Sequence, residues 1–372
     1  MVNPLEHLPG NVMMKKIFNI IIFLLVALFL LLLLNNCKQQ NKKTTEAYPL
    51  VEGEYIGQEK PGLTPDLFAP GILSTRHYEN SITFSPNGKE IYFAIAAPRN
   101  FFVILFMKHE NNRWKKPQVA PFSGKYKDGF PFFAPGGKRI YFCSCRPLSN
   151  TKEHKKDWDI WVVDKTNPGW SEPQNLGFPV NSDSNDKSPT VTGDGTLYFS
   201  RSKKGSADIY RSKFVNGKYM QPEKLSDSIN SPCYETHPYI APDESYIIFS
   251  SYERPDGFGK ADIYISFRKE DGSWTRSENM GKKMNTRTHE NCAIISPDGK
   301  FLFFCSYRRT PYKTYWKKTL TYDEVLAKIE TLDNYYPDGC PNFYWVDSKI
   351  IEQFKTTYVE QEKKNKRKEE IE

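Results

Sequence analysis

Short runs of apolar and aromatic residues, cut by turn-forming residues, recur along most of the chain. A clear instance is Leu302-Phe303-Phe304, which follows the turn sequence Ser296-Pro297-Asp298-Gly299. In such a turn proline fixes φ, aspartate hydrogen-bonds to nearby backbone and glycine takes a positive φ, so the flanking runs form a hairpin. Aromatic residues make up 15% of the sequence, with 26 Pro and 22 Gly, and this favours many short strands over helices. We therefore predict an all-β fold.

The hairpin belongs to a repeat that occurs five times. Each copy runs from an acidic residue to a turn residue nine positions later, which is glycine in every copy except the fourth, where it is Glu244. The five acidic residues, spaced by 49, 58, 49 and 55 positions, are Glu79, Asp128, Asp186, Glu235 and Glu290. A period of about 50 residues leaves room for two further strands per copy, and four strands per repeat is typical of a β-propeller blade. The sequence therefore predicts a single β-propeller of four-stranded blades.

The ring of blades is expected to be closed by a strand from the N-terminal side. Residues 65–73 precede the first acidic residue at nearly the same distance as the fourth strands elsewhere, so we assign them to the last blade. Residues 342–345 are predicted to supply the third strand of that blade. Closure of this kind removes the open edge of the ring. This count gives five blades, and the alternative is a degenerate sixth blade that opens at residues 338–340.

The repeat resembles the WD40-like, TolB-type propeller repeat of exported bacterial proteins. The resemblance is carried by Ser296 to Phe304, which is close to the core motif of that repeat, and it extends to the segments 55–71 and 343–351. Together these cover residues 55–354, which we take as the propeller domain. The resemblance implies a propeller, commonly with six blades in TolB-like rings, but it says little about function, because propellers carry unrelated activities.

The first 36 residues are predicted to be a signal peptide or an anchor. Lys15 and Lys16 precede an uncharged apolar run over 20–34, which is the plan of a secretory signal and is short for a membrane-spanning helix. Cys37 follows, at the head of a polar linker over 37–54, and the arrangement resembles a bacterial lipoprotein signal, in which the cysteine is lipidated after cleavage. We predict an exported protein, lipid-anchored at the outer membrane or the periplasmic face of the cell envelope. An uncleaved anchor helix and an ordinary secreted protein are the alternatives.

Two further segments fall outside the repeat. Residues 307–338 are predicted to form an insertion with a helical stretch over 321–330, and residues 355–372 a charged tail, either disordered or a frayed helix.

The distribution of charge along the chain bears on nucleic-acid binding. The formal net charge is +8, of which +3 lies in residues 1–47 and +1 in the tail. The remaining charge is spread over a mixed surface, which argues against nucleic-acid binding.

The five repeated acidic residues are the first candidates for a binding site. Each begins an innermost strand, so together they are expected to ring one mouth of the central channel. The loop after each second strand carries an arginine on the same face: Arg99, Arg146, Arg201, Arg254 and Arg308 or Arg309. One interpretation is a polar mouth that binds a cation, a peptide or a glycan. The other is that each carboxylate pairs with an arginine or caps a loop, and so holds its blade together.

Histidines provide a second, non-repeated set of candidates. His237 and His289 lie next to acidic residues of the ring and are candidate metal ligands or general bases. With Arg308 they cluster around the fourth and fifth blades, beside the insertion. Whether a metal binds is left open. No cofactor is expected, because the sequence has no HExxH motif, no glycine-rich phosphate loop and no GxSxG elbow.

Six cysteines remain once Cys37 is assigned to the lipid. Cys292 and Cys305 lie roughly opposite each other if 292–296 pairs with 301–305, so a disulfide there is one alternative. Small buried thiols are the other.

These patterns favour binding over catalysis. Most polar signals repeat in every blade, whereas an enzyme needs unique polar residues gathered on one face. We therefore predict a non-catalytic binding or scaffold propeller that recognises a protein or glycan partner at the envelope through its channel mouth and loops. The alternative is a propeller hydrolase or lyase that uses carboxylates of the acidic ring as acid and base on an envelope or extracellular glycan.

Overall fold

The computed structural model describes residues 18–23, 51–75, 77–97, 101–148, 157–308, 340–356 and 358. The chain divides into two units, Met1–Leu50 and Val51–Glu372. In the first unit residues 18–23 are helical and exposed. Within the described part of the chain no helix is long and apolar enough to cross a membrane. Cys37 lies outside the described residues, so its lipidation stays a prediction.

The second unit is built from five antiparallel blades, and the first three follow one another along the chain. Blade 1 contains β2 (Tyr78–Phe84), β3 (Glu90–Ala97), β4 (Phe101–Glu110) and β6 (Gln118–Val119), with β5 (Arg113–Trp114) paired to the end of β4. Blade 2 contains β7 (Asp128–Phe133), β8 (Arg139–Ser144), β9 (Asp159–Asp164) and β10 (Gln174–Asn175). Blade 3 contains β11 (Asn185–Val191), β12 (Leu197–Lys203), β13 (Ser206–Ser212) and β16 (Glu223–Lys224), with a small hairpin of β14 (Phe214–Val215) and β15 (Lys218–Tyr219) before β16.

The last two blades complete the ring. Blade 4 contains β17 (Tyr234–Ile240), β18 (Tyr246–Tyr252), β19 (Ala261–Phe267) and β20 (Glu278–Asn279), followed by the short helix α2 (Gly281–Met284). Blade 5 contains β21 (Glu290–Ile295), β22 (Phe301–Ser306), β23 (Asn342–Asp347) and β1 (Asp66–Leu67). The predicted all-β propeller is confirmed.

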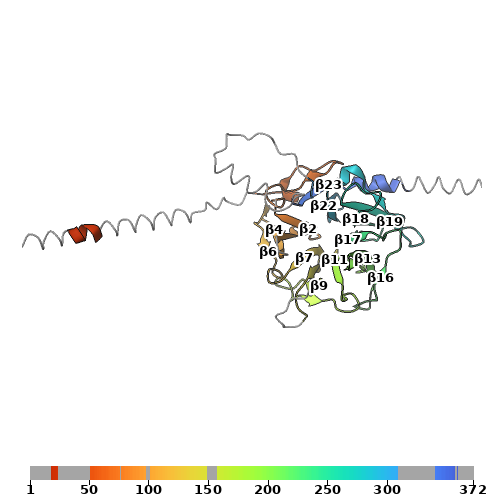
Figure 1. Ribbon diagram of the computed structural model, residues 1–372, viewed down its shortest axis with the longest axis horizontal. Helices are drawn as coiled ribbons and strands as arrows, with labels where there is room; N and C mark the ends of the chain where they lie inside the picture. Colours follow the sequence, from red (N-terminus) through yellow and green to blue (C-terminus); the bar gives the residue numbers. More distant parts are fainter. Residues whose placement is uncertain are drawn as a thin grey trace, which may run out of the picture. The chain divides into compact units, whose positions relative to one another are not determined.

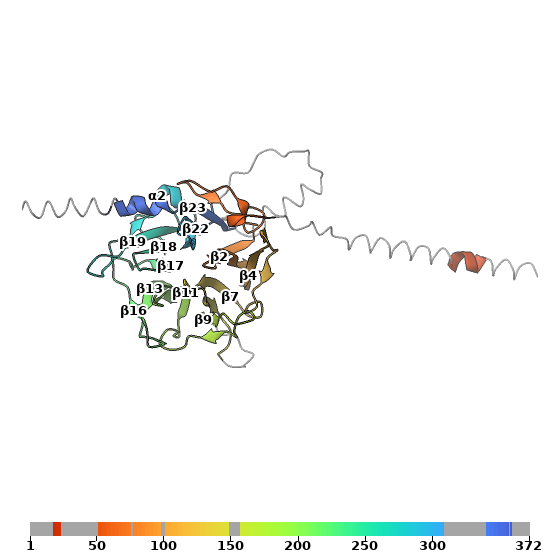
Figure 2. The same cartoon turned by 180° about the vertical axis from the view of Figure 1, so that it is seen from behind.

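Ring closure follows the predicted plan. Strand β1 pairs antiparallel with β23, through Asp66 opposite Trp345 and Leu67 opposite Tyr344. Innermost strand β2 contacts β7 of blade 2 and also β21, β22 and β23 of blade 5. Figure 1 shows β2, β7, β11 and β17 arranged around one centre, and Figure 2 shows the same ring from behind. The described residues therefore form a closed ring of five blades, and 342–347 belongs to the fifth rather than opening a sixth.

The hydrophobic core lies between neighbouring blades. Tyr92, Phe122 and Phe142 belong to a buried cluster that joins blades 1 and 2, and Tyr198 and Phe249 belong to another that joins blades 3 and 4. Full burial of one such side chain stabilises the fold by roughly 2–3 kcal/mol. The aromatic runs of the repeat therefore serve to pack one blade against the next.

Structured residues also lie just outside both ends of the predicted propeller range 55–354. The compact unit begins at Val51, four residues before the predicted start, because Glu52 makes a backbone bridge to Arg113 of blade 1. At the C-terminal side residues 349–356 and 358 are helical, so this helix runs across the predicted boundary at residue 354. Ile350 and Ile351 are buried. Of the predicted insertion, only residues 307–308 lie within the described part of the chain.

Candidate functional site

The five acidic residues lie at or next to the start of the innermost strands, as predicted, and their side chains are completely buried. Each has no exposed surface in the folded chain. The positions are Glu79, Asp128, Asp186, Glu235 and Glu290. Burial of a carboxylate is costly in free energy unless it is paired and hydrogen-bonded. The partners of these carboxylates therefore distinguish a structural role within each blade from a role in binding.

Four of the five carboxylates pair with the predicted arginine of their own blade. The nitrogen–oxygen distances are 2.7 Å for Asp128 and Arg146, 2.6 Å for Asp186 and Arg201, 3.0 Å for Glu235 and Arg254, and 3.7 Å for Glu290 and Arg308. The fifth expected partner, Arg99, lies outside the described residues. Arg308, predicted as a binding residue, is thus engaged with Glu290 inside its blade.

Each arginine is also held by a backbone carbonyl and by aromatic rings. Arg146 donates from Nη2 to the carbonyl of Phe122 at 2.9 Å, and its guanidinium lies 4.9 Å from the Phe142 ring and 5.2 Å from the Trp161 ring. The other three arginines repeat this arrangement on the second and third strands of their blades. The arginines therefore tie three strands and the preceding loop together.

The carboxylates also cap the loop that leads into each innermost strand. In four blades a serine or threonine four residues earlier donates both its backbone N–H and its hydroxyl to the carboxylate: Thr75, Ser182, Ser231 and Thr286. In blade 2 the hydroxyl of Ser123 donates a hydrogen bond to the Asp128 carboxylate at 3.0 Å. Burial nevertheless raises the pKa of Asp128 and Asp186, outweighing the nearby arginines, which act to lower it. The geometry matches the structural interpretation of the acidic ring.

Glu79 differs from the other four carboxylates. Its Oε1 accepts hydrogen bonds from Thr75, but its buried Oε2 has no partner among the described residues. Burial raises the pKa of this carboxyl from 4.5 to about 7. The raised pKa allows Glu79 to exchange a proton near neutral pH.

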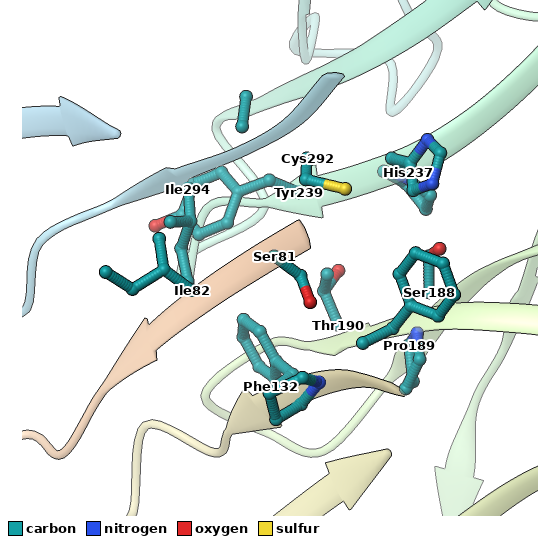
Figure 3. Close-up of a pocket in the computed structure, with 14 residues that line it drawn as sticks. Ser81, Ile82, Phe132, Ser188, Pro189, Thr190, His237, Tyr239, Cys292 and Ile294 are labelled. Carbon is teal, nitrogen blue, oxygen red and sulfur yellow. The ribbon is translucent and has the colours of Figure 1, made fainter. Parts of the chain in front are cut away.

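The central channel narrows two residues beyond the acidic ring. Each innermost strand has a bulge there, and the residue at that position has a φ between 51° and 57° without being glycine. These residues are Ser81, Phe130, Ser188, His237 and Cys292. They line a cavity of about 40 Å³, and Figure 3 shows the labelled members from different strands around the same opening. This constriction has room for a few water molecules only.

His237 therefore lies in the constriction rather than at the mouth, where the sequence placed it. Its Nδ1 is buried without a partner among the described residues, and its ring lies 5.3 Å from the Phe130 ring. Burial lowers the pKa of His237 to about 3, so the imidazole is neutral at physiological pH. Within the described residues no group of three or more His, Cys, Asp or Glu side chains is arranged to hold a metal.

The residues directly before the carboxylates lie at the end of the innermost strands where the mouth is predicted, and the sequence identified this set only in part. All five are half-buried and they differ between blades: Tyr78, Lys127, Asn185, Tyr234 and His289. Variation at a repeated register is the signal that would have identified the whole set, since structural positions repeat.

Aromatic rings surround His289 at this mouth. Its ring lies 5.0 Å from Tyr307 and 5.7 Å from Tyr252, and Tyr252 lies 5.5 Å from Tyr234. Tyr307 donates a hydrogen bond to Tyr78 across the closure of the ring. On the blade 2 side, the Lys127 ammonium lies 4.9 Å from the Trp158 ring. The structure thus brings His289 and Tyr234 together, with His237 two residues past the ring and Arg308 inside its blade.

Comparison with known proteins does not extend beyond solved structures of low similarity. No family model matches this sequence, and no curated protein matches it. Similar solved structures include a candidate TolB from Agrobacterium tumefaciens, with 18% identity and a TM-score of 0.41 over 67% of this chain and 82% of that one. TolB from Acinetobacter baumannii has 18% identity and a TM-score of 0.43 over 70% of this chain and 58% of that one. An alpha-L-arabinofuranosidase from Lactobacillus brevis has 12% identity and a TM-score of 0.44 over 74% and 91%. The propeller assignment itself rests on the closed ring of five blades.

Proposed function

We propose that this chain is an exported binding propeller, tethered at the cell envelope, that recognises a protein or glycan partner at the channel mouth. The observation that carries the proposal is the contrast between two neighbouring positions. The carboxylates repeat, and four of the five pair with an arginine inside their own blade, whereas the residues directly before them vary and are half-exposed. Repeated contacts serve the architecture, so we assign ligand recognition to the varied set.

The chemistry of the mouth suits recognition. Tyr234, Tyr252 and His289 offer rigid aromatic surfaces with polar ends, which favour contact with partners at low cost in side-chain entropy. Lys127, directly before β7, adds a positive charge on the blade 2 side. No catalytic pair is needed for this role.

The binding proposal is tested by substitutions at the mouth. We expect Lys127→Ala and Tyr234→Ala to reduce co-sedimentation of the full-length chain with purified peptidoglycan sacculi, or photo-crosslinking to one discrete envelope protein, at least tenfold. Lys138→Ala is the matched control, because Lys138 is an exposed lysine in the turn at the other end of blade 2. Binding that neither mouth substitution weakens would rule out this surface.

Membrane tethering is tested separately at Cys37. If Cys37 carries the lipid, Cys37→Ser removes incorporation of an alkyne-labelled fatty acid and moves the protein from the membrane fraction to the soluble exported fraction. Labelling that survives the substitution would exclude a lipoprotein.

A second candidate function is supported by Glu79 alone. Its carboxylate oxygen Oε2, which has no partner among the described residues, and its pKa of about 7 suit a general acid in a glycan hydrolase or lyase. The expected result is release of new reducing ends from envelope polysaccharide, abolished by Glu79→Gln. If the wild-type chain binds a polysaccharide but releases no reducing ends from it, the hydrolase or lyase function is excluded and the non-catalytic function stands.

A further inference from the structure

A second cavity lies at the far end of the innermost strands from the mouth. Its volume is about 350 Å³, which is within the range of small-molecule sites. The N-terminal residues 53–55, here called the strap, form one wall, and the turns 86–89 and 297–298 form the rim. Its floor includes the buried side chains of Phe84, Ile91 and Trp114.

The strap is fixed in place by specific contacts. Trp114 donates from Nε1 to the carbonyl of Gly53 at 2.8 Å, and Tyr55 donates its hydroxyl to Oδ1 of Asp298 at 2.7 Å. The Tyr55 ring also packs edge-on against Phe301 at 5.0 Å. Tyr55 and Ile56 have φ values of 47° and 63°, a left-handed conformation that persists only where surrounding contacts enforce it. The cavity is therefore preformed rather than created by a ligand.

One polar atom at this cavity is left unused. His109 lines the cavity with its ring 5.1 Å from the Trp114 ring, and its buried Nε2 has no hydrogen-bond partner among the described residues. Buried polar atoms without partners are rare in native proteins, and each calls for an occupant or a role. A hydroxyl of a bound molecule would satisfy this nitrogen.

The charges around the cavity favour a neutral occupant. Asp298 is matched by Lys300 at 3.2 Å, and the other two charged lining residues, Glu54 and Lys89, are of opposite sign. Aromatic rings on the floor and wall offer flat apolar surfaces, and Glu54, Asn87 and His109 offer hydrogen-bonding groups around them. Flat apolar faces bordered by hydroxyls are the chemistry of a sugar ring.

We propose that this cavity binds a neutral mono- or disaccharide. The site lies at the opposite end of the innermost strands from the mouth and shares none of its residues, so the inference goes beyond the proposed function. A proline-rich peptide is the competing occupant, because Pro86, Pro297 and aromatic rings line the rim and floor. It does not account for His109 Nε2, which has no hydrogen-bond partner among the described residues.

The test uses the full-length chain in a detergent without a sugar headgroup. Methyl glucoside, N-acetylglucosamine, maltose and a proline decamer are each titrated, with calorimetry and saturation-transfer NMR as readouts. We expect at least one of the neutral saccharides to bind, and His109→Phe to weaken that binding at least tenfold while keeping an aromatic ring beside Trp114. Glu54→Ala should weaken it as well. Glu270→Ala, which removes an exposed carboxylate from a turn of blade 4, is the matched control and should change nothing.

Three outcomes would overturn the proposal. One is that no saccharide binds at concentrations up to about 50 mM, since weaker binding would be too weak for recognition. Another is that saccharide binding is insensitive to both His109→Phe and Glu54→Ala. The third is that the proline decamer binds instead and is lost with the same two substitutions. His109→Phe removes a buried nitrogen that has no partner in the described part of the chain, so the melting temperature of this variant should not fall. Lost binding would then not be explained by unfolding.

Discussion

At the scale of single residues, the buried arginines show how a charge can serve a blade. Arg146 has 8% of its side chain exposed, donates to Asp128 and to a backbone carbonyl, and lies near three aromatic rings. The network also reaches blade 1, because Ser123, which donates to Asp128, accepts from the Ile104 N–H at 3.0 Å. The arginine therefore compensates a carboxylate that could not otherwise remain charged in the interior.

Removing that arginine should be strongly destabilising. In Arg146→Met the Asp128 carboxylate keeps its burial but loses its counter-charge, and we expect the free energy of unfolding to fall by about 3–5 kcal/mol. Urea denaturation followed by circular dichroism measures this. Arg113→Met is the matched control, because its ion pair with Glu52 is 57% and 45% exposed and should contribute less than about 1 kcal/mol. Equal effects of the two substitutions would show that the acidic ring does not stabilise the blades.

Glu79 should make stability depend on pH in a recognisable direction. Because burial raises its pKa from 4.5 to about 7, the folded chain keeps a proton that the unfolded chain releases between these values. Stability from this group is fully present below pH 4.5 and is lost as pH rises to about 7, by about 3 kcal/mol in all. Glu79→Gln should flatten this part of the stability curve, measured by urea denaturation at several pH values. Asp128 and Asp186 act in the same direction in both proteins, so the difference between the two curves isolates Glu79. Parallel curves would contradict the assignment.

At the scale of elements, the sequence predicted the hairpins but not the bulges. Turn residues such as Pro297 and Gly299 have local conformational preferences, so the turns were readable. The bulges were not, because Ser188 and His237 adopt positive φ under constraints from neighbouring blades rather than from their own preferences. This is why His237 was expected at the mouth and is found in the constriction.

Strand β1 is the element on which ring closure depends. Phe68, directly after β1, is fully buried and lies 4.9 Å from Phe303 and 5.1 Å from Trp345. We expect Phe68→Ala to lower the free energy of unfolding by about 3–5 kcal/mol, since it leaves a cavity where the first and last parts of the propeller meet. Phe178→Ala is the control, because Phe178 is 86% exposed and should change stability by less than about 0.5 kcal/mol. A small effect of Phe68→Ala in the same denaturation assay would mean that closure by β1 contributes little.

At the scale of the whole molecule, the repeat predicted the ring of blades but did not indicate the candidate binding positions. Counting acidic residues and placing 65–73 in the last blade gave five blades, because each blade carries the same turn and aromatic run. The same repetition drew attention to Glu235 and its equivalents, which are internal. Lys127 and the cavity beside His109 do not repeat, and the contacts that define them come from segments far apart in the sequence. Only the folded chain brings those segments together.

The thiols offer a test of whether the ring unfolds as one unit. No disulfide joins any two of the six described cysteines. Cys143 and Cys145 are buried in and beside blade 2, Cys292 and Cys305 are buried in blade 5, and Cys233 and Cys340 are half-buried. Burial raises the pKa of Cys145 to about 11 and also raises that of Cys143 and Cys292, so these thiols should resist alkylation until they are exposed.

Pulsed alkylation with N-ethylmaleimide across a urea series, read by peptide mass spectrometry, distinguishes the outcomes. In the native chain we expect modification at Cys233 and Cys340 only, among the six. The four protected thiols should then become reactive at one common urea concentration, because closure by β1 links the last blade to the first and makes opening cooperative. Reaction in blade 2 at lower urea than in blade 5 would show that blades open independently. If Cys292 and Cys305 stayed unmodified even in full denaturant without reductant, the chain would carry the disulfide that their spacing allows, and the thiol assignment would be wrong.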